Sequence, residues 1–151
     1  MRLIAIGRLK PGPEAELFAR YNVRLRPKLD VTELPEGTGA PAEIKRREAD
    51  AILAALPDSA FAVALDLGAA APASEDFARV LESWQGQGRK LAFLIGGAEG
   101  LESRVLARAN HVLSLGAWTW PHMLVRVMLA EQIYRAQAIL AGHPYHRGGR
   151  P

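Results

Sequence analysis

The chain has 151 residues and a net charge of +3; 49% of its residues are hydrophobic, 23% are charged and none is cysteine. This length predicts a single domain, residues 1–151, and the missing cysteines exclude disulfides, thiol catalysis and cysteine-bound metal. No apolar run is long enough for a membrane span or a signal peptide, so we expect a cytoplasmic protein with no membrane partner.

The first half of the chain predicts two strand–helix units. Residues 2–7 are typical of a short buried strand, and a helix is expected over 13–26, after two prolines. A second strand is expected over 31–35. The Gly- and Pro-rich stretch 36–43 predicts a loop, and residues 43–56 predict a helix that begins charged and ends apolar.

The second half has a clearer pattern, because its strands are continuously apolar, as in strands covered on both faces. Ser74 is a candidate N-cap for the first helix of this half. The last helix opens at a proline and is stopped by Gly142. The alternation predicts an α/β fold with a mainly parallel sheet and helices on both faces. The expected strands are 61–68, 90–97 and 111–116, and the expected helices are 74–84, 102–109 and 121–140.

Three strand ends carry unusual residues, and they predict one shared pocket. The stretches are LDLG (65–68), LIGGAEG (94–100) and LSLGAWTWPH (113–122). In open α/β sheets, ligands bind beyond the carboxyl ends of the strands. Adjacent glycines at Gly96 and Gly97 let a ligand approach the backbone closely, although a tight strand–helix turn is the alternative. The stretch matches neither a dinucleotide-binding motif nor a P-loop.

Two aromatic residues in the third stretch allow two interpretations. Trp118 and Trp120 can form the walls of a flat apolar pocket, or they can simply cover the edge of the sheet. His122 follows in the first turn of the last helix, where a structural histidine is more common than a catalytic one.

The last helix is largely apolar, so it must be buried against more than its own sheet. A subunit interface and a central helix of a monomer both satisfy this requirement. Glu131 and Arg135 are four residues apart and are expected to pair on one face of the helix.

The chain ends on GHPYHRGGRP, which contains His143, Tyr145, His146 and Arg147. A metal site is poorly supported, because His-x-x-His has no carboxylate nearby. RNA binding fits better, since tyrosine stacks on bases and arginine binds phosphate. A disordered tail is the third interpretation.

Charge also differs along the chain. Residues 1–30 hold seven Lys/Arg against three Asp/Glu and residues 100–151 hold six against two, whereas residues 31–99 hold six against eleven. If the two basic ends meet in space, they form a face suited to a polyanion; an ordinary solvated surface is the alternative.

Several of these stretches together resemble the ribosomal RNA large-subunit methyltransferase H family. The resemblance covers essentially the whole chain in order, from LIAIGRLK and ALDLG…SEDFA through LIGGAEGL to LSLGAWTWPHMLVRVMLAEQIYRAQAI and HPYHR. It implies a SPOUT-class, S-adenosylmethionine-dependent methyltransferase with a C-terminal trefoil knot. It also implies a homodimer that methylates N3 of a pseudouridine in large-subunit (23S) ribosomal RNA, in the assembled ribosome.

The resemblance assigns two sets of residues and no metal. Target-base recognition and catalysis fall to His143, Tyr145, His146 and Arg147, and we add Arg135. The arginines would stabilise ring oxygens or phosphate, Tyr145 would stack on or hydrogen-bond the base, and a histidine would assist the proton. The cofactor-binding set implied by the resemblance is Leu65, Gly96, Gly97, Leu115, Gly116, Ala117, Trp118, Thr119 and Trp120.

One departure from the family pattern lies after Gly68, where many relatives carry a lysine and this chain has Ala69. Either that lysine is dispensable or another basic residue replaces it. Two other functions stay open at this point: a ribosome- or RNA-binding protein that has lost methyl transfer, and a generic nucleotide-binding domain.

Overall fold

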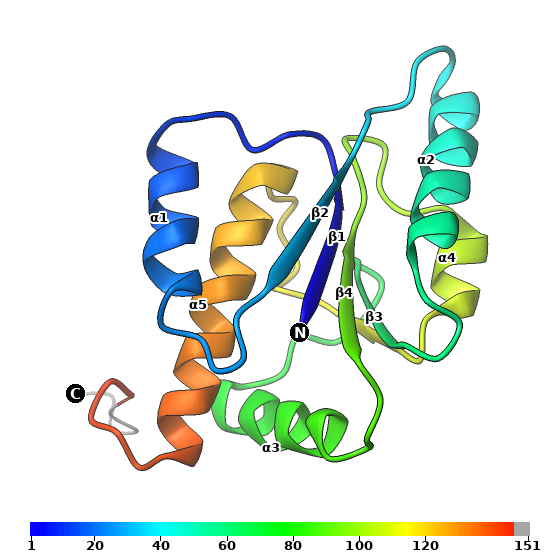
Figure 1. Ribbon diagram of the computed structural model, residues 1–151. Coiled ribbons are helices and arrows are strands. Elements are labelled where there is room, and N and C mark those ends of the chain that lie inside the picture. Colours follow the sequence, from blue (N-terminus) through cyan, green and yellow to red (C-terminus); the bar gives the residue numbers. More distant parts are fainter. Residues whose placement is uncertain (147–151) are drawn as a thin grey trace.

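A computed structural model describes residues 1–146 and contains one five-stranded parallel sheet in the order β2-β1-β4-β3-β5 (Figure 1). Register is defined by pairs such as Ile4 with Leu94 and Val63 with Phe93. All five expected strands are present: β1 (Arg2–Ile6), β2 (Asp30–Leu34), β3 (Phe61–Leu65), β4 (Leu91–Ile95) and β5 (His111–Leu113).

Helices cover both faces of the sheet, as the sequence predicted. Figure 1 shows α1, α3 and α5 on one face and α2 and α4 on the other. The helices are α1 (Pro13–Asn22), α2 (Pro41–Ala55), α3 (Ser74–Gln85), α4 (Ser103–Arg108) and α5 (His122–Leu140).

The core consists of two layers, because alternate strand residues point to opposite faces. Leu3, Val63 and Phe93 pack with buried residues of α1, α3 and α5. Ile4, Ala64 and Leu94 pack with those of α2 and α4. This is why the strands are apolar at nearly every position.

The boundaries differ from the sequence prediction at several places. Helix α1 ends at Asn22 rather than at residue 26, because the helical conformation is disfavoured just before a proline such as Pro27. Strands β3 and β4 end at Leu65 and Ile95, and the residues after them already belong to the loops. Helix α2 already begins at Pro41, inside the stretch expected to be a loop, because proline is well tolerated in the first turn. The N-cap of α3 is Ala73 rather than Ser74. Strand β5 ends at Leu113, so residues 114–116 belong to the following loop.

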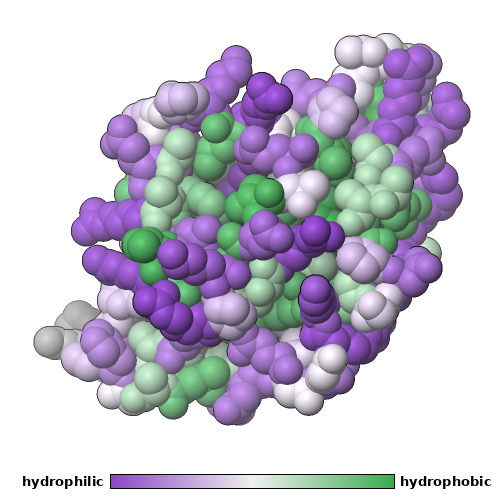
Figure 2. Space-filling model, in the orientation of Figure 1, coloured by the Kyte–Doolittle hydropathy of each residue, from purple (hydrophilic) through white to green (hydrophobic). Residues whose placement is uncertain are grey.

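Parts of the two basic segments, helices α1 and α5, meet in space, whereas α4 lies on the other face of the sheet and residues 147–151 lie outside the described residues. Helices α1 and α5 pack against each other, and the segment after α1 is tied to α5 by a pair of hydrogen bonds. The Arg26 N–H donates to Gln137 Oε1 at 3.1 Å, and Gln137 Nε2 donates to the Arg26 carbonyl at 2.7 Å. On the face shown in Figure 2, hydrophobic areas are small and lie between hydrophilic side chains.

Within residues 1–146, no helix combines the length and the apolar character that crossing a membrane requires.

Candidate active site

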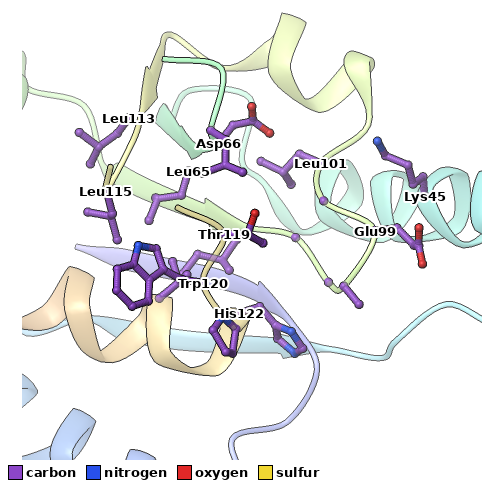
Figure 3. Close-up of a pocket in the computed structure, with 18 residues that line it drawn as sticks. Lys45, Leu65, Asp66, Glu99, Leu101, Leu113, Leu115, Thr119, Trp120 and His122 are labelled. Atoms are coloured by element: carbon purple, nitrogen blue, oxygen red, sulfur yellow. The ribbon is translucent and has the colours of Figure 1, made fainter. Parts of the chain in front are cut away.

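The predicted pocket lies at the carboxyl edge of the sheet, where the chain leaves β3, β4 and β5. It has a volume of about 730 Å³, and the start of α5 closes one side of it. Figure 3 shows Leu113, Leu115 and Trp120 at one end, and Lys45 and Glu99 at the other. The pocket therefore has an apolar end and a charged end.

Six of the nine predicted cofactor residues line this pocket and three do not. Those that line it are Leu65, Gly96, Gly97, Leu115, Thr119 and Trp120. Gly116, Ala117 and Trp118 lie in the same loop but outside the lining. Trp118 in particular is 74% exposed and packs against Trp120 at 6.0 Å between ring centroids, so it does not form a wall of the pocket.

Sequence reasoning missed several residues of the lining. Lys45 comes from α2, far from the three strand-end stretches, and no local pattern marked it. Asp66 and Glu99 lie in two of the strand-end stretches, LDLG and LIGGAEG, but were not predicted as site residues. The Asp66 carboxylate accepts a hydrogen bond from Gly68 N at 2.8 Å and so shapes the turn after β3.

Two buried nitrogens at the pocket have no hydrogen-bond partner in the described part of the chain: Trp120 Nε1 and His122 Nε2. Both residues line the pocket. Because a buried polar group without a partner is costly, these atoms fit a site that receives a polar ligand. Glycines that bring the backbone close and an apolar end for a planar ring are compatible with S-adenosylmethionine.

His122 is held in place by the end of β1. Gly7 has a φ of +85°, in the left-handed region. A Cβ at this position would lie 2.9 Å from Glu36 Oε1, 2.9 Å from Met123 Cε and 3.2 Å from His122 Nε2. The side chains of the first turn of α5 therefore pack closely onto a glycine, and a residue with a side chain there would be strained by its backbone conformation and would push on them.

The described part of the tail folds back onto α5 and forms a hydrogen-bonded group, which we call the tail cluster: Glu131, Arg135, Tyr145 and His146. The Tyr145 hydroxyl donates to Glu131 Oε1 at 3.0 Å, and Arg135 Nη2 donates to the same oxygen at 2.6 Å, as expected for this pair. His146 Nδ1 lies 3.4 Å from Arg135 Nη1. The pairing of Glu131 with Arg135 was predicted, but only Arg135 was predicted as a site residue.

The other tail residues stand apart from this cluster. His143 is exposed, and its Nδ1 accepts a hydrogen bond from the Tyr145 backbone N–H at 3.2 Å. Gly142 has a φ of +64° and ends α5, as predicted. Arg147 lies outside the described residues. No group of three His, Cys, Asp or Glu side chains within residues 1–146 is arranged to hold a metal ion.

Two pKa shifts occur at the tail. Burial, with hydrogen bonds to Tyr21 and Glu131, raises the pKa of the Tyr145 hydroxyl well above its usual value. The hydrogen bond from His146 lowers the pKa of Glu75, whose Oε1 lies 2.8 Å from His146 Nε2. Tyr145 therefore stays protonated and able to donate a hydrogen bond.

The pocket and the tail cluster lie at opposite ends of α5 and do not form one site within a single chain. Helix α5 has 19 residues, which corresponds to about 28 Å at 1.5 Å per residue. His122 stands at its start beside the pocket, and Tyr145 follows its end.

The fold is shared with two solved structures. A probable methylase family protein from Haemophilus influenzae Rd KW20 superposes over 99% of this chain and 71% of its own, with a TM-score of 0.60 at 10% identity. TrmJ from Z. mobilis ZM4 superposes over 99% of this chain and 72% of its own, with a TM-score of 0.54 at 18% identity. At these identities the likeness concerns the fold alone.

Residues 1–146 match the family model described as "Predicted SPOUT methyltransferase". Together, the parallel sheet, the pocket at its carboxyl edge and this match define the class: a SPOUT methyltransferase, which uses S-adenosylmethionine as methyl donor.

Relatives define the family more narrowly. "Ribosomal RNA large subunit methyltransferase H" from Gluconacetobacter diazotrophicus is 65% identical over 151 residues, which cover 100% of this chain and 99% of that relative. The protein of the same name from Acidiphilium cryptum is 63% identical over 100% of this chain and 96% of its own. The chain belongs to the ribosomal RNA large subunit methyltransferase H family, and the resemblance seen in the sequence motifs is confirmed.

Proposed function

We propose that this enzyme methylates large-subunit (23S) ribosomal RNA at N3 of a pseudouridine, in the assembled ribosome. The observation that carries the proposal is the 65% identity over the full chain with a relative of that name. The pocket at the carboxyl edge of the sheet and the tail cluster give this reaction a place for the methyl donor and a set of groups for the base. We infer a cytoplasmic enzyme, because ribosomes are there.

The methyl donor binds in the pocket lined by Leu65, Gly96, Gly97, Leu115, Thr119 and Trp120. S-adenosylmethionine, when bound, supplies an electrophilic methyl group on a positively charged sulfur. The apolar end of the pocket receives the adenine ring, and the Lys45–Glu99 end faces the charged amino and carboxylate groups of the methionine part. Many relatives carry a lysine where this chain has Ala69. Lys45 can take the place of that lysine, since it brings a basic side chain to this pocket from α2.

The tail cluster acts on the target base. N3 of pseudouridine is an imide nitrogen, so its proton must leave and the charge that develops on the ring must be stabilised. Arg135 and Arg147 stabilise the ring oxygens or a nearby phosphate, and Tyr145 stacks on the base or donates a hydrogen bond to it. His143 or His146 assists removal of the proton, since an imidazole ring nitrogen can accept one.

The enzyme works as a homodimer whose partner subunit brings its tail to this pocket. The first support is the length of α5, which separates the pocket from the tail cluster in one chain. The second support is the side of α5 that faces away from the core. Leu124 and Met128 are only half-buried there, in a helix that is mostly apolar. Two such helices packed in opposite directions bring each tail to the other subunit's pocket.

The trefoil knot implied by the resemblance is part of this proposal. After β5, at one edge of the sheet, the chain returns to its middle, where α5 packs against both α1 and α3. Arg126 of α5 donates hydrogen bonds to the carbonyls of Ile6 and Gly7, at the end of a central strand. This return path over the carboxyl edge is where a SPOUT knot would form.

A transfer experiment tests the function. The protein is incubated with methyl-labelled S-adenosylmethionine and with ribosomes or free large subunits that lack the modification, and label is located by nuclease digestion and mass spectrometry. We expect label at N3 of one pseudouridine in the large-subunit RNA of whole ribosomes. Cofactor binding without transfer would indicate an inactive RNA-binding relative, and absence of cofactor binding would contradict the methyltransferase assignment.

A further inference from the structure

Glu48 is a buried carboxylate beside the candidate active site that the proposed mechanism does not use. It stands on α2, one turn after Lys45, and only 4% of it is exposed. Buried glutamates are rare unless they have partners. No ion pair of Glu48 is found within residues 1–146; its partners are two backbone N–H groups instead.

These N–H groups belong to two separate loops. Glu48 Oε1 accepts a hydrogen bond from Gly37 N at 3.0 Å, in the loop between β2 and α2. Oε2 accepts one from Gly97 N at 3.3 Å, in the loop that follows β4 and lines the pocket. One carboxylate thus joins two loops at the carboxyl edge of the sheet.

The contact also accounts for the second glycine of IGG. A Cβ at Gly97 would lie 2.8 Å from each carboxylate oxygen of Glu48, which is closer than real Cβ atoms come to other atoms. Gly97 is not among the glycines with positive φ. Space for the carboxylate in its present position, rather than backbone conformation, therefore favours glycine at this position.

We propose that Glu48 is a positioning residue for the methyl-donor pocket: its carboxylate fixes the Gly97 backbone, and with it the loop 96–100, in the shape that receives S-adenosylmethionine. Hydrogen bonds to a carboxylate are about twice as strong as bonds between neutral groups. A loop already held in place loses less conformational freedom when the ligand binds, so affinity rises. The inference rests on the proposed location of the methyl donor in this pocket.

The first test is calorimetric titration of the whole protein with S-adenosylmethionine, in the absence of RNA. Glu48→Gln keeps the size of the side chain but has only one oxygen to accept the two N–H groups. We expect binding to weaken about tenfold or more, the effect of losing one buried bond to a charged group. Glu43→Gln, the same change at a half-exposed position in the first turn of the same helix, should bind like the wild type.

The second test is hydrogen–deuterium exchange of the ligand-free proteins, together with their thermal unfolding. We expect faster exchange confined to residues 36–38 and 96–101 in Glu48→Gln, and on ribosomes a higher KM for S-adenosylmethionine with kcat near the wild-type value. If Glu48→Gln does not fold, Gly97→Ala replaces it, because one added methyl group pushes the loop off an intact carboxylate and should weaken binding similarly.

Folded Glu48→Gln or Gly97→Ala with wild-type affinity and wild-type exchange would overturn the proposal. The proposal would also be overturned if the fraction of unfolded protein accounted for the whole loss of affinity, since Glu48 would then have a purely structural role. If the wild type itself fails to bind S-adenosylmethionine, the proposed function fails, while the exchange comparison still decides whether Glu48 fixes the loop.

Discussion

Arg126 and Glu33 form an ion pair at the end of the sheet, with 2.8 Å between Arg126 Nη1 and Glu33 Oε1. The arginine is 0% exposed, and its Nη2 donates to the carbonyls of Ile6 and Gly7 at 2.7 Å each. Glu33 Oε1 also accepts the Leu9 N–H at 2.7 Å. One side chain of α5 thus ties the last helix to β1, β2 and the loop after β1.

Replacing this arginine should destabilise the fold strongly. Arg126→Met leaves the buried carbonyls of Ile6 and Gly7 without their side-chain donor and removes the cation beside the partly exposed Glu33. Each buried acceptor left without a partner costs about 1–3 kcal/mol. Urea denaturation measures the loss. Arg79→Ala removes an exposed pair with Asp76, so it should change stability by no more than about 0.5 kcal/mol. Equal effects of the two substitutions would contradict the role of Arg126.

Gly7→Ala should reduce both stability and affinity for S-adenosylmethionine. The backbone conformation alone costs about 1–2 kcal/mol for a residue with a side chain, and the added methyl group also pushes against His122 at the pocket. Gly88→Ala is the matched control, because Gly88 has a φ of +69° but no atom within 4 Å of its Cβ position. We expect both variants to lose a similar amount of unfolding free energy, because both glycines have a positive φ. Binding of S-adenosylmethionine should weaken only in Gly7→Ala.

Lys45→Met should weaken binding of S-adenosylmethionine severalfold while leaving the fold intact. The substitution keeps an apolar stem of similar length and removes the charge that faces the carboxylate of the ligand in our proposal. Arg46→Met changes the adjacent cation, which does not line this pocket, and should have no such effect. If the two variants titrate alike in a calorimeter, the charged end of the pocket does not bind the methionine part.

Stability should fall at high pH through Tyr145. The pKa of this hydroxyl is raised in the folded protein, chiefly by burial, so the unfolded chain releases the proton first as pH increases. The stabilising contribution is complete below a pH of about 10, the ordinary tyrosine pKa, and is lost progressively above it. Between pH 9 and 11, the unfolding free energy of the wild type should fall more steeply than that of Tyr145→Phe; parallel curves would disprove the link.

Mixed dimers test whether a site is shared between subunits. Gly96→Val should disable a pocket, since even a Cβ there would lie 2.9 Å from the Gly100 carbonyl carbon. Arg135→Ala should disable a tail cluster. Each homodimer is expected to be inactive on ribosomes, whereas the purified heterodimer keeps one site with an intact pocket and an intact tail. A heterodimer without activity would show that pocket and tail act within the same chain.

Much of the fold could be predicted from the sequence, because continuous apolar strands alternate with helices of clear period. The pocket was predicted for a related reason: strands in a parallel sheet end at the same edge, so Leu65, Gly96 and Leu115 had to lie near one another. The pairing of Glu131 with Arg135 followed from helical spacing alone.

What sequence reasoning missed depends on packing between distant segments. Residues 114–121 form an irregular loop without a period, so nothing indicated that Trp120 points into the pocket while Trp118 points away. Lys45 reaches the pocket, and Glu48 reaches the backbone of Gly97, from a helix some fifty residues before the loop that contains Gly97. The burial of Arg126 was equally hidden, since an arginine in an apolar helix can lie on either side.

The crowding at Gly7 has a consequence for how this pocket can change over time. Three segments far apart in the chain meet where that residue lacks a side chain, and one of them carries His122. A mutation that adds a carbon at position 7 pushes on the ends of the three neighbouring side chains, and one of these, His122, lines the pocket 115 positions later. Substitutions at the seventh residue of this enzyme are therefore limited by the pocket that forms at the start of its last helix.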